Sequence, residues 1–231
     1  MIQIAEVYSS LQGEGRLAGT PSVFVRTSGC NLRCSWCDTP FTSWKPSGTN
    51  RSVNDLVQEV LSHNLTHVVI TGGEPLLSPD INLLCNRLKK SKQHITIETA
   101  ATVIPDKDPP SVNLMSLSPK LQSSTPASKT GWQRRHEDRR RRDDVIQRLR
   151  ATPSQIKFVI DSPSDLDEAI LWLRELGIRP RSKEARHVYL MPQGVTLPQL
   201  QKETGWLHSA CESLGFQFCQ RHHISWFGNT R

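Results

Sequence analysis

The sequence contains no hydrophobic run long enough to cross a membrane, which would need about 18–20 consecutive apolar residues. Its first six residues lack the basic start and the apolar stretch of a secretory signal. Internal repeats and a linker that would divide the chain are also missing. We therefore expect a soluble cytoplasmic protein that folds as one domain over residues 1–231 and makes no contact with membranes.

The composition is that of a folded protein. Apolar residues make up 36% of the 231 residues, enough to fill a core, which excludes a wholly disordered chain. The formal net charge is +7, but it is unevenly spread. Residues 132–150 hold eight arginines and four acidic residues, so this stretch supplies +4 and the rest of the chain +3. One Arg-rich segment differs from a continuous basic face for nucleic acid.

The Arg-rich segment belongs to an insertion at 122–150 that is longer than a minimal connection requires. Opposite charges four residues apart predict a solvated surface helix rather than an RNA-binding arm, and we expect no direct contact with nucleic acid. The insertion could instead cover the site or a dimer surface. The predicted ion pairs are Arg134 with Asp138, Arg139 with Asp143 and Arg140 with Asp144.

The six cysteines do not form the pattern of a secreted disulfide framework, which spreads its cysteines through a small, core-poor chain. Three of them lie within eight residues, at Cys30, Cys34 and Cys37. The other three are scattered, at Cys85, Cys211 and Cys219. This distribution predicts metal ligation in a reducing compartment.

Short apolar runs alternate with helical patterns along the chain. The predicted strands are 22–27, 67–71, 95–98, 114–118, 155–160 and 187–191. The predicted helices are 53–61, 80–90, 164–176 and 197–214, the last with a possible break at Gly205. This alternation predicts an α/β fold with a parallel sheet and helices packed outside it. Because a complete eight-fold barrel typically needs about 250 residues, we expect an open or incomplete barrel.

The cysteine trio follows the first of these predicted strands, as Cys30-Asn-Leu-Arg-Cys34-Ser-Trp-Cys37. Thiolates suit zinc or iron–sulfur clusters. Structural zinc usually takes four ligands, and no second pair of cysteines is nearby. Three thiolates can hold a four-iron cluster and leave one iron open to another ligand. A zinc site completed by Asp38, or three unrelated thiols, are the alternatives.

Two further motifs contain glycine next to polar groups. Thr71-Gly72-Gly73-Glu74-Pro75 follows a predicted strand, and its glycines allow the backbone to approach a ligand while Glu74 could accept hydrogen bonds from an amine. Near the N-terminus, residues 9–15 read as a loop that offers an amide, a carboxylate and bare backbone to a heterocycle. Each motif alone could equally be an ordinary turn.

Taken together, these motifs resemble the radical S-adenosylmethionine (SAM) superfamily and, within it, the 7-carboxy-7-deazaguanine synthases. The matching segments run in order as LQGEG, FVRTSGCNLRCSWCDT, TGGEP, IETA, LSPK and a tail at 220–222. The resemblance implies an incomplete (β/α)6 TIM-like barrel. It also implies a radical-mediated ring contraction of 6-carboxy-5,6,7,8-tetrahydropterin to 7-carboxy-7-deazaguanine with release of ammonia, on the route to queuosine and other 7-deazapurines.

The resemblance also implies cofactors and their contacts. A [4Fe–4S] cluster would be held by Cys30, Cys34 and Cys37. SAM would bind the open iron and would be split by one electron to give a 5′-deoxyadenosyl radical. Its protein contacts would be Gly73, Ser118, Pro119 and Lys120. A Mg2+ ion bridging to the substrate carboxylate would contact Thr39, in keeping with its preference for oxygen ligands.

The substrate contacts follow from the same resemblance. The N-terminal segment 1–20 would shape the pterin pocket, which would be lined by Leu11, Gln12 and Gly13. Arg26 would pair with the substrate carboxylate, for which its fork of donors is suited, and Thr71 would touch the substrate. The polar groups placed near the reacting atoms would be Glu14, Glu98 and His222. We read His222 and His223 as part of a strand, so that only one of them points inward.

The implied partners are a flavodoxin-like reductant and a second copy of the chain in a homodimer. Residues 224–231 differ from the family's usual short endings, so no substrate contact beyond His222 is carried over. Two alternatives remain at this stage. One is another radical SAM enzyme, such as an activase that installs a glycyl radical on a partner. The other is a non-enzymatic, metal-bearing RNA-binding module.

Overall fold

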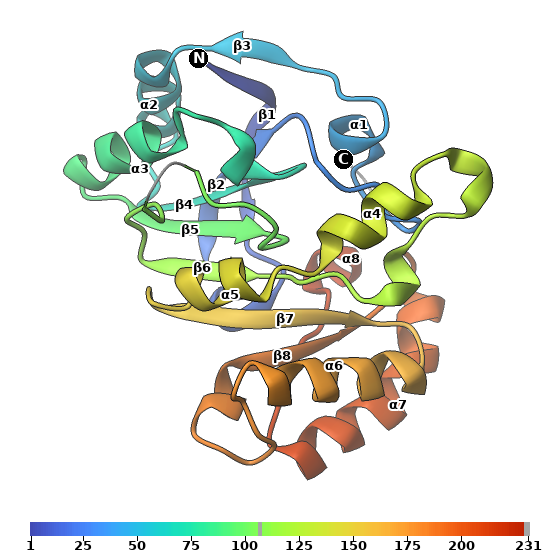
Figure 1. Ribbon diagram of the computed structural model, residues 1–231. Helices are drawn as coiled ribbons and strands as arrows, with labels where there is room; N and C mark the ends of the chain where they lie inside the picture. Colours follow the sequence, from blue (N-terminus) through green and yellow to red (C-terminus); the bar gives the residue numbers. More distant parts are fainter. Residues whose placement is uncertain (106–107, 229–231) are drawn as a thin grey trace.

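The computed structural model describes residues 1–105 and 108–228, apart from the side chain of Glu203. Its strands form one open, mixed sheet in the order β3-β1-β2-β4-β5-β6-β7-β8-β9 (Figure 1). From β2 to β9, each neighbouring pair is parallel. The expected incomplete barrel is confirmed. The parallel strands are β2 Pro21–Thr27, β4 His67–Gly72, β5 His94–Thr99, β6 Leu114–Leu117, β7 Ser154–Ile160, β8 Val188–Pro192 and β9 Gln217–Phe218.

The four predicted helices are present, and the longest runs through Gly205 without a break. Ser52 and Ser162 accept backbone hydrogen bonds at the starts of two of them, as helix-capping residues do. In each helix, apolar residues three or four positions apart form one face, and this face packs against the sheet. The bounds are α2 Val53–Ser62, α3 Ile81–Lys90, α6 Pro163–Glu175 and α7 Leu197–Leu214.

The two faces of the sheet differ in character because side chains alternate along a strand. In β4, Val68 and Ile70 belong to the apolar core shared with the helices, whereas Thr71 does not. In β7, Ile156 and Phe158 join that core, whereas Lys157 does not. The face turned away from the helices therefore carries the polar residues of the strands.

Sequence patterns missed the antiparallel edge of the sheet. β1 Ile2–Leu11 pairs with β2 on one side and with β3 Thr49–Arg51 on the other. The interpretation of 9–15 as a loop is thus wrong for residues 9–11, which end β1, and only the residues from Gln12 onward leave the sheet. A register irregularity between Ile4 and Glu6 interrupts the alternation that would have revealed this strand.

The Arg-rich insertion is not one solvated helix. It forms two short turns, Gln122–Ser124 and Ser128–Thr130, and then α4 Gln133–Arg140 and α5 Asp143–Leu149. The break at 141–142 removes the spacing on which two of the three predicted ion pairs depended. α5 also buries Val145, Ile146 and Leu149 in the core.

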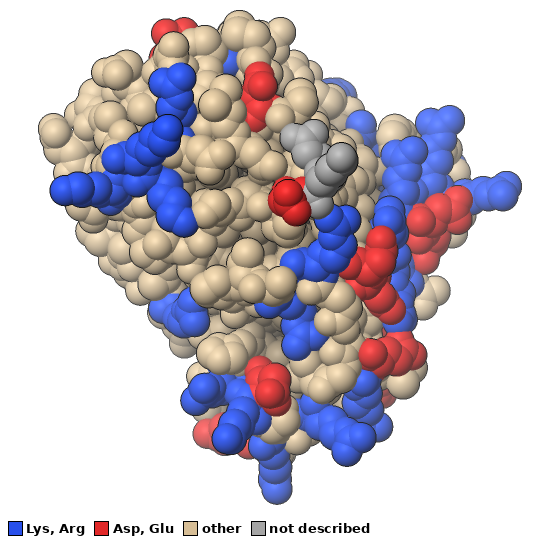
Figure 2. Space-filling model, turned by 60° about the vertical axis from the view of Figure 1, so that its left-hand side comes forward, with Lys and Arg blue, Asp and Glu red and all other residues tan. Residues whose placement is uncertain are grey.

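The ion pairs of the insertion differ accordingly. Arg134 and Asp138 lie 3.9 Å apart, as predicted, but both are largely exposed. Arg140 instead pairs with Glu137 and Glu168, each at 2.8 Å. On the face shown in Figure 2, Lys and Arg form separate groups, and along its right-hand margin they are mixed with Asp and Glu.

The last element of the described residues is a helix where we expected a strand. α8 His222–Phe227 contains both histidines, so their side chains do not alternate across a sheet. The remaining short elements are α1 Pro40–Ser43 and the turns Gly15–Leu17, Pro75–Leu77 and Glu184–His187. Among the described residues, none of the helices combines the length and the apolar character that a membrane span requires.

Candidate active site

A row of polar side chains crosses the sheet on the face turned away from the helices. The strand register places Arg26 opposite Thr71, and Ser116 opposite both Glu98 and Gln155. Gln155 donates to Ser116 Oγ at 2.9 Å. Parallel strands thus bring residues more than a hundred positions apart into one line.

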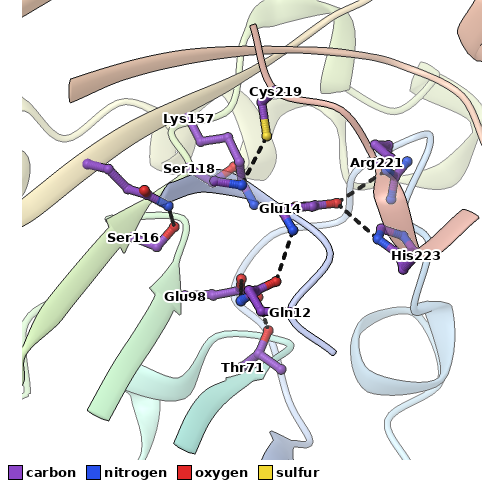
Figure 3. A network of polar contacts seen from close by, with 12 residues as sticks. Gln12, Glu14, Thr71, Glu98, Ser116, Ser118, Lys157, Cys219, Arg221 and His223 are labelled. Atoms are coloured by element: carbon purple, nitrogen blue, oxygen red, sulfur yellow. Dashed lines mark hydrogen bonds and ion pairs between the residues drawn. The ribbon is translucent and has the colours of Figure 1, made fainter. Parts of the chain in front are cut away.

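Gln12, Thr71 and Glu98 meet at the centre of this row (Figure 3). Gln12 Nε2 donates to Glu98 Oε1 at 3.1 Å, and Thr71 Oγ1 donates to Glu98 Oε2 at 2.9 Å. The three come from the loop after β1, from β4 and from β5. The structure therefore brings together three of the residues for which the sequence predicted substrate contacts.

Arg26 lies at one end of the row. It donates from Nε to Glu6 Oε1 at 2.6 Å and from Nη2 to the Tyr8 hydroxyl at 2.7 Å. Tyr8 in turn stacks on Phe24, with ring centroids 5.2 Å apart. These contacts hold the guanidinium in place and use two of its five N–H donors.

Glu14 is the anion of a largely buried charge cluster (Figure 3). Its carboxylate forms ion pairs with Lys157 and with Arg221, whose Nε lies 3.3 Å away, and His223 Nδ1 lies at 3.8 Å. Burial alone would raise the pKa of Glu14, but the positive charges of Lys157 and Arg221 hold that pKa well below its ordinary value. Glu14 is therefore a carboxylate and a hydrogen-bond acceptor at neutral pH.

Arg221 connects this cluster to other segments. Its Nη2 donates to Asp38 Oδ2 at 2.6 Å, directly after the last cysteine of the trio, and its Nη1 donates to the carbonyl of Gly194 at 2.6 Å. One guanidinium thus joins the N-terminal loop, the cysteine loop, the connection after β8 and the start of α8.

The cysteine loop, residues 28–39, has no regular secondary structure. Cys30 and Cys37 pack with buried Cys34 against Leu32 and Ala100. Burial raises the pKa of the Cys30 thiol to about 11 and that of Cys34 to about 12, although nearby Lys120 opposes both shifts. A metal is what converts such buried thiols into stable thiolates.

The cysteine loop fits the [4Fe–4S] cluster. The three thiols are soft donors from one loop, the donor set that such clusters take. Two buried polar atoms of the loop, Ser28 Oγ and Trp36 Nε1, lack a hydrogen-bond partner in the described part of the chain, as expected beside a bound group. Within residues 1–105 and 108–228, no three His, Cys, Asp or Glu side chains are arranged to hold a single metal ion. A cluster differs because each cysteine binds a different iron.

The glycine turn after β4 packs on the cysteine loop. Gly73 N–H donates to the Thr27 carbonyl at 3.1 Å, and Glu74 N–H donates to the Gly29 carbonyl at 2.9 Å. A Cβ atom at position 73 would lie 2.1 Å from the Gly29 carbonyl oxygen, so only glycine allows this approach.

The Glu74 carboxylate accepts hydrogen bonds from two neighbouring segments of the chain. Its side chain is 1% exposed and accepts hydrogen bonds from Leu76 N–H, Thr99 Oγ1 and Ala100 N–H. These hydrogen bonds join the turn after β4 to the end of β5.

The remaining predicted cofactor contacts lie around the cysteine loop. Lys120 Nζ donates to Ser118 Oγ at 2.9 Å and lies 5.8 Å from the centre of the Trp36 ring, while Pro119 between them is buried. Thr39 Oγ1 lies 3.9 Å from Cys37 Sγ and 3.3 Å from Thr42 Oγ1.

The N-terminal motif is closed by the C-terminal helix. Leu11 is the last residue of β1, and the carbonyl of Gly13 accepts a hydrogen bond from His222 N–H at 3.0 Å. The His222 ring stacks on Trp226, so the histidine that reaches Glu14 is His223. Residues 229–231 of the tail lie outside the described residues.

Sequence reasoning missed four residues of the site: Gln155, Lys157, Arg221 and His223. A lysine in the middle of a predicted strand was a usable signal for Lys157, because a charge there needs a partner if both faces of a parallel sheet are covered. Arg221 lies within the matching tail segment 220–222, but its ion pairs with Glu14 and Asp38 could not be inferred from that segment.

The chain is similar to known proteins in both sequence and fold. The model of the radical SAM superfamily matches residues 24–202. The 7-carboxy-7-deazaguanine synthase of Rhodopirellula baltica is 46% identical over 99% of this chain and 87% of its own, and that of Halobacterium salinarum is 41% identical over 97% and 90%. The crystal structure of QueE from Escherichia coli matches with a TM-score of 0.71 over 96% of this chain and 94% of that one, at 23% identity, which supports the fold.

The ion pair between Glu14 and Lys157 allows a first prediction. Glu14→Gln leaves the buried Lys157 ammonium without its anion and should lower the free energy of unfolding at pH 7 by about 3–5 kcal/mol. The double variant Glu14→Gln/Lys157→Met should recover most of this loss. Glu59→Gln, which breaks a more exposed pair with Arg51, is the control and should cost less than about 1 kcal/mol. Urea denaturation measures all three.

The same pair predicts how stability depends on pH. Because the pKa of Glu14 is lowered in the folded state, its contribution is complete above the ordinary value of 4.5 and is lost as the pH falls below it. The unaltered protein should therefore lose stability more steeply below about pH 4.5 than the double variant does. Parallel pH profiles for the two proteins would contradict the assigned role of Glu14.

Proposed function

Because the chain belongs to the radical SAM superfamily and, within it, to the 7-carboxy-7-deazaguanine synthases, we propose that it converts 6-carboxy-5,6,7,8-tetrahydropterin into 7-carboxy-7-deazaguanine with release of ammonia. The observation that carries this proposal is the 46% identity to a named synthase over 99% of the chain. The polar row and the cysteine loop supply the groups that this reaction needs.

Cys30, Cys34 and Cys37 would hold the [4Fe–4S] cluster, to which SAM would bind. When bound, the cluster and SAM together supply the one-electron cleavage whose radical removes hydrogen from the pterin. The SAM side of the site is formed by Gly73, Ser118, Pro119 and Lys120. In support of this arrangement, the turn at Gly73 packs on the cysteine loop and Lys120 lies beside Trp36 of that loop.

The polar row binds the pterin. A pterin ring presents both donors and acceptors at its edge, and Gln12, Thr71 and Glu98 offer a matching set. Arg26 at the end of the row pairs with the substrate carboxylate through donors that Glu6 and Tyr8 do not use. Leu11 and Gly13 line the pocket from the N-terminal segment.

Glu14, Glu98 and His222 act near the reacting atoms. Lys157 and Arg221 keep Glu14 ionised, so it accepts a hydrogen bond from the substrate rather than donating a proton. His222 begins α8, where its backbone N–H donates to the carbonyl of Gly13 in the N-terminal motif. Thr39 would contact a Mg2+ ion, a hard cation that prefers oxygen ligands and would supply positive charge for the substrate carboxylate.

The proposal extends to partners and location. The electron comes from a flavodoxin-like reductant, and the active form is a homodimer that makes no contact with nucleic acid or membranes. None of the six cysteines forms a disulfide, which fits the reducing cytoplasm. The product then enters the route to queuosine or another 7-deazapurine.

Anaerobically reconstituted protein, supplied with SAM, Mg2+, a reductant and the carboxytetrahydropterin, tests the function. We expect 7-carboxy-7-deazaguanine and an equal amount of ammonia. SAM cleavage without this product would instead indicate another radical SAM enzyme, such as a glycyl-radical activase. Zinc without iron or sulfide would indicate the RNA-binding module.

Arg26→Ala should mainly weaken substrate binding. Losing a charge-assisted, bidentate contact should raise KM about 10–100-fold, while SAM cleavage remains possible. Arg26→Lys keeps the charge but not the fork of donors, so its KM should lie between those of the unaltered protein and Arg26→Ala. Arg87→Ala, on the exposed side of α3, serves as the control. An unchanged substrate affinity in Arg26→Ala would remove Arg26 from the pocket.

Thr39→Ala should reduce the stimulation of activity by Mg2+, because it removes the oxygen assigned to that ion. Thr39→Ser keeps the oxygen and should retain the stimulation. Titrating activity against Mg2+ concentration compares the three proteins, and identical Mg2+ dependence in the alanine variant would contradict the assignment.

A further inference from the structure

The backbone of the cysteine loop finds its hydrogen-bond partners in the insertion at 122–150. Ser35 N–H donates to the Ser124 carbonyl at 2.8 Å, and Arg33 N–H donates to His136 Nδ1 at 3.2 Å. From the other direction, Arg139 Nη1 donates to the Asn31 carbonyl at 3.3 Å. Figure 1 shows α4, which carries two of these residues, beside the loop that follows β2.

His136 is the buried centre of this contact, with no exposed surface. Ser124 Oγ donates to the Leu121 carbonyl at 2.6 Å, so toward His136 it can only accept. His136 Nε2 must therefore carry the proton and donate to Ser124 Oγ at 2.9 Å. This leaves Nδ1 unprotonated, as the acceptor that Arg33 N–H requires.

Side chains reinforce the contact. Trp132, next to α4, packs under the Arg33 guanidinium, whose central carbon lies 4.2 Å from the ring centre. Arg33 itself donates to the carbonyls of Cys30 and Leu32 at 2.7 and 2.8 Å. The insertion is thus fixed to residues 31–35 of the loop, on both sides of the second cysteine.

From these contacts we propose that His136 is a positioning residue, and that the insertion at 122–150 holds the cysteine loop in its metal-binding shape before the cluster arrives. A loop without secondary structure loses backbone conformational entropy when it is ordered, and this loss opposes cluster binding. Contacts that already order the loop remove this cost from cluster binding. The inference rests on the cluster assigned above and adds the device that shapes its loop.

Hydrogen exchange of the metal-free protein tests the device without any need for activity. The amides of Arg33 and Ser35 should be protected in the unaltered chain. In His136→Ala, which leaves Arg33 N–H without its acceptor, the Arg33 amide should exchange about tenfold faster. Fast exchange of both amides in the unaltered chain would overturn the proposal, even if no variant folds.

Iron retention is the second measurement. After anaerobic reconstitution, His136→Ala should lose iron to a chelator about tenfold faster than the unaltered protein. His136→Asn, whose amide oxygen can replace Nδ1 as the acceptor, should restore most of the retention. Glu137 is the next residue on α4 and pairs with Arg140 rather than with the loop, so Glu137→Gln should lose iron as slowly as the unaltered protein.

The possible outcomes separate the two proposals. If the unaltered protein takes up no iron and sulfide, the assigned function fails, whereas the hydrogen exchange still reports on the loop. If it takes up the cluster but His136→Ala retains iron equally well at an equal Tm, the positioning role fails. Faster loss in both His136→Ala and Glu137→Gln would indicate a general loss of stability and would also count against it.

Discussion

The site depends on the charge balance around one buried carboxylate. Glu14 lies on the loop that leaves β1, and it is stable as an anion there because Lys157 and Arg221 face it. Without them, burial would favour the neutral acid, and without Glu14 two cations would be left in a buried place. The charge cluster of Glu14, Lys157 and Arg221 therefore connects three distant segments, namely the N-terminal loop, the middle of β7 and the start of α8.

The parallel sheet allows the same strands to supply both the apolar core and the polar residues of the site. Each strand gives one face to the apolar core, so its alternate positions are left for polar groups on the other face. The strand register then aligns Arg26, Thr71, Glu98 and Gln155 across neighbouring strands. No two of these residues are close in sequence, and their order in space follows only from the order of the strands.

Local patterns along the chain predicted the elements that have them, but not the contacts between distant segments. Six of the seven parallel strands and the four long helices carry strong apolar patterns and were predicted close to their observed bounds, whereas the two-residue β9 was not predicted. β1 was missed because its alternation is interrupted, and the Arg-rich segment was misread because opposite charges at helical spacing do not reveal a break at 141–142. Gln12, Thr71 and Glu98 could be named from motifs, whereas the ion pairs that Lys157 and Arg221 form with Glu14 join distant segments and could not be inferred from any local pattern.

The shape of the cysteine loop also depends on contacts with distant parts of the chain. It has no helix or strand of its own, so its shape must come from its surroundings. At its start, Gly29 accepts a hydrogen bond from Glu74 N–H of the glycine turn, in its middle Arg33 donates to His136, and at its end Asp38 accepts from Arg221. These three supports come from separate parts of the chain and share no residue. Because they act at different points of the loop, the weakening of one leaves the other two in place, so changes in this region should alter metal retention by degrees rather than abolish it.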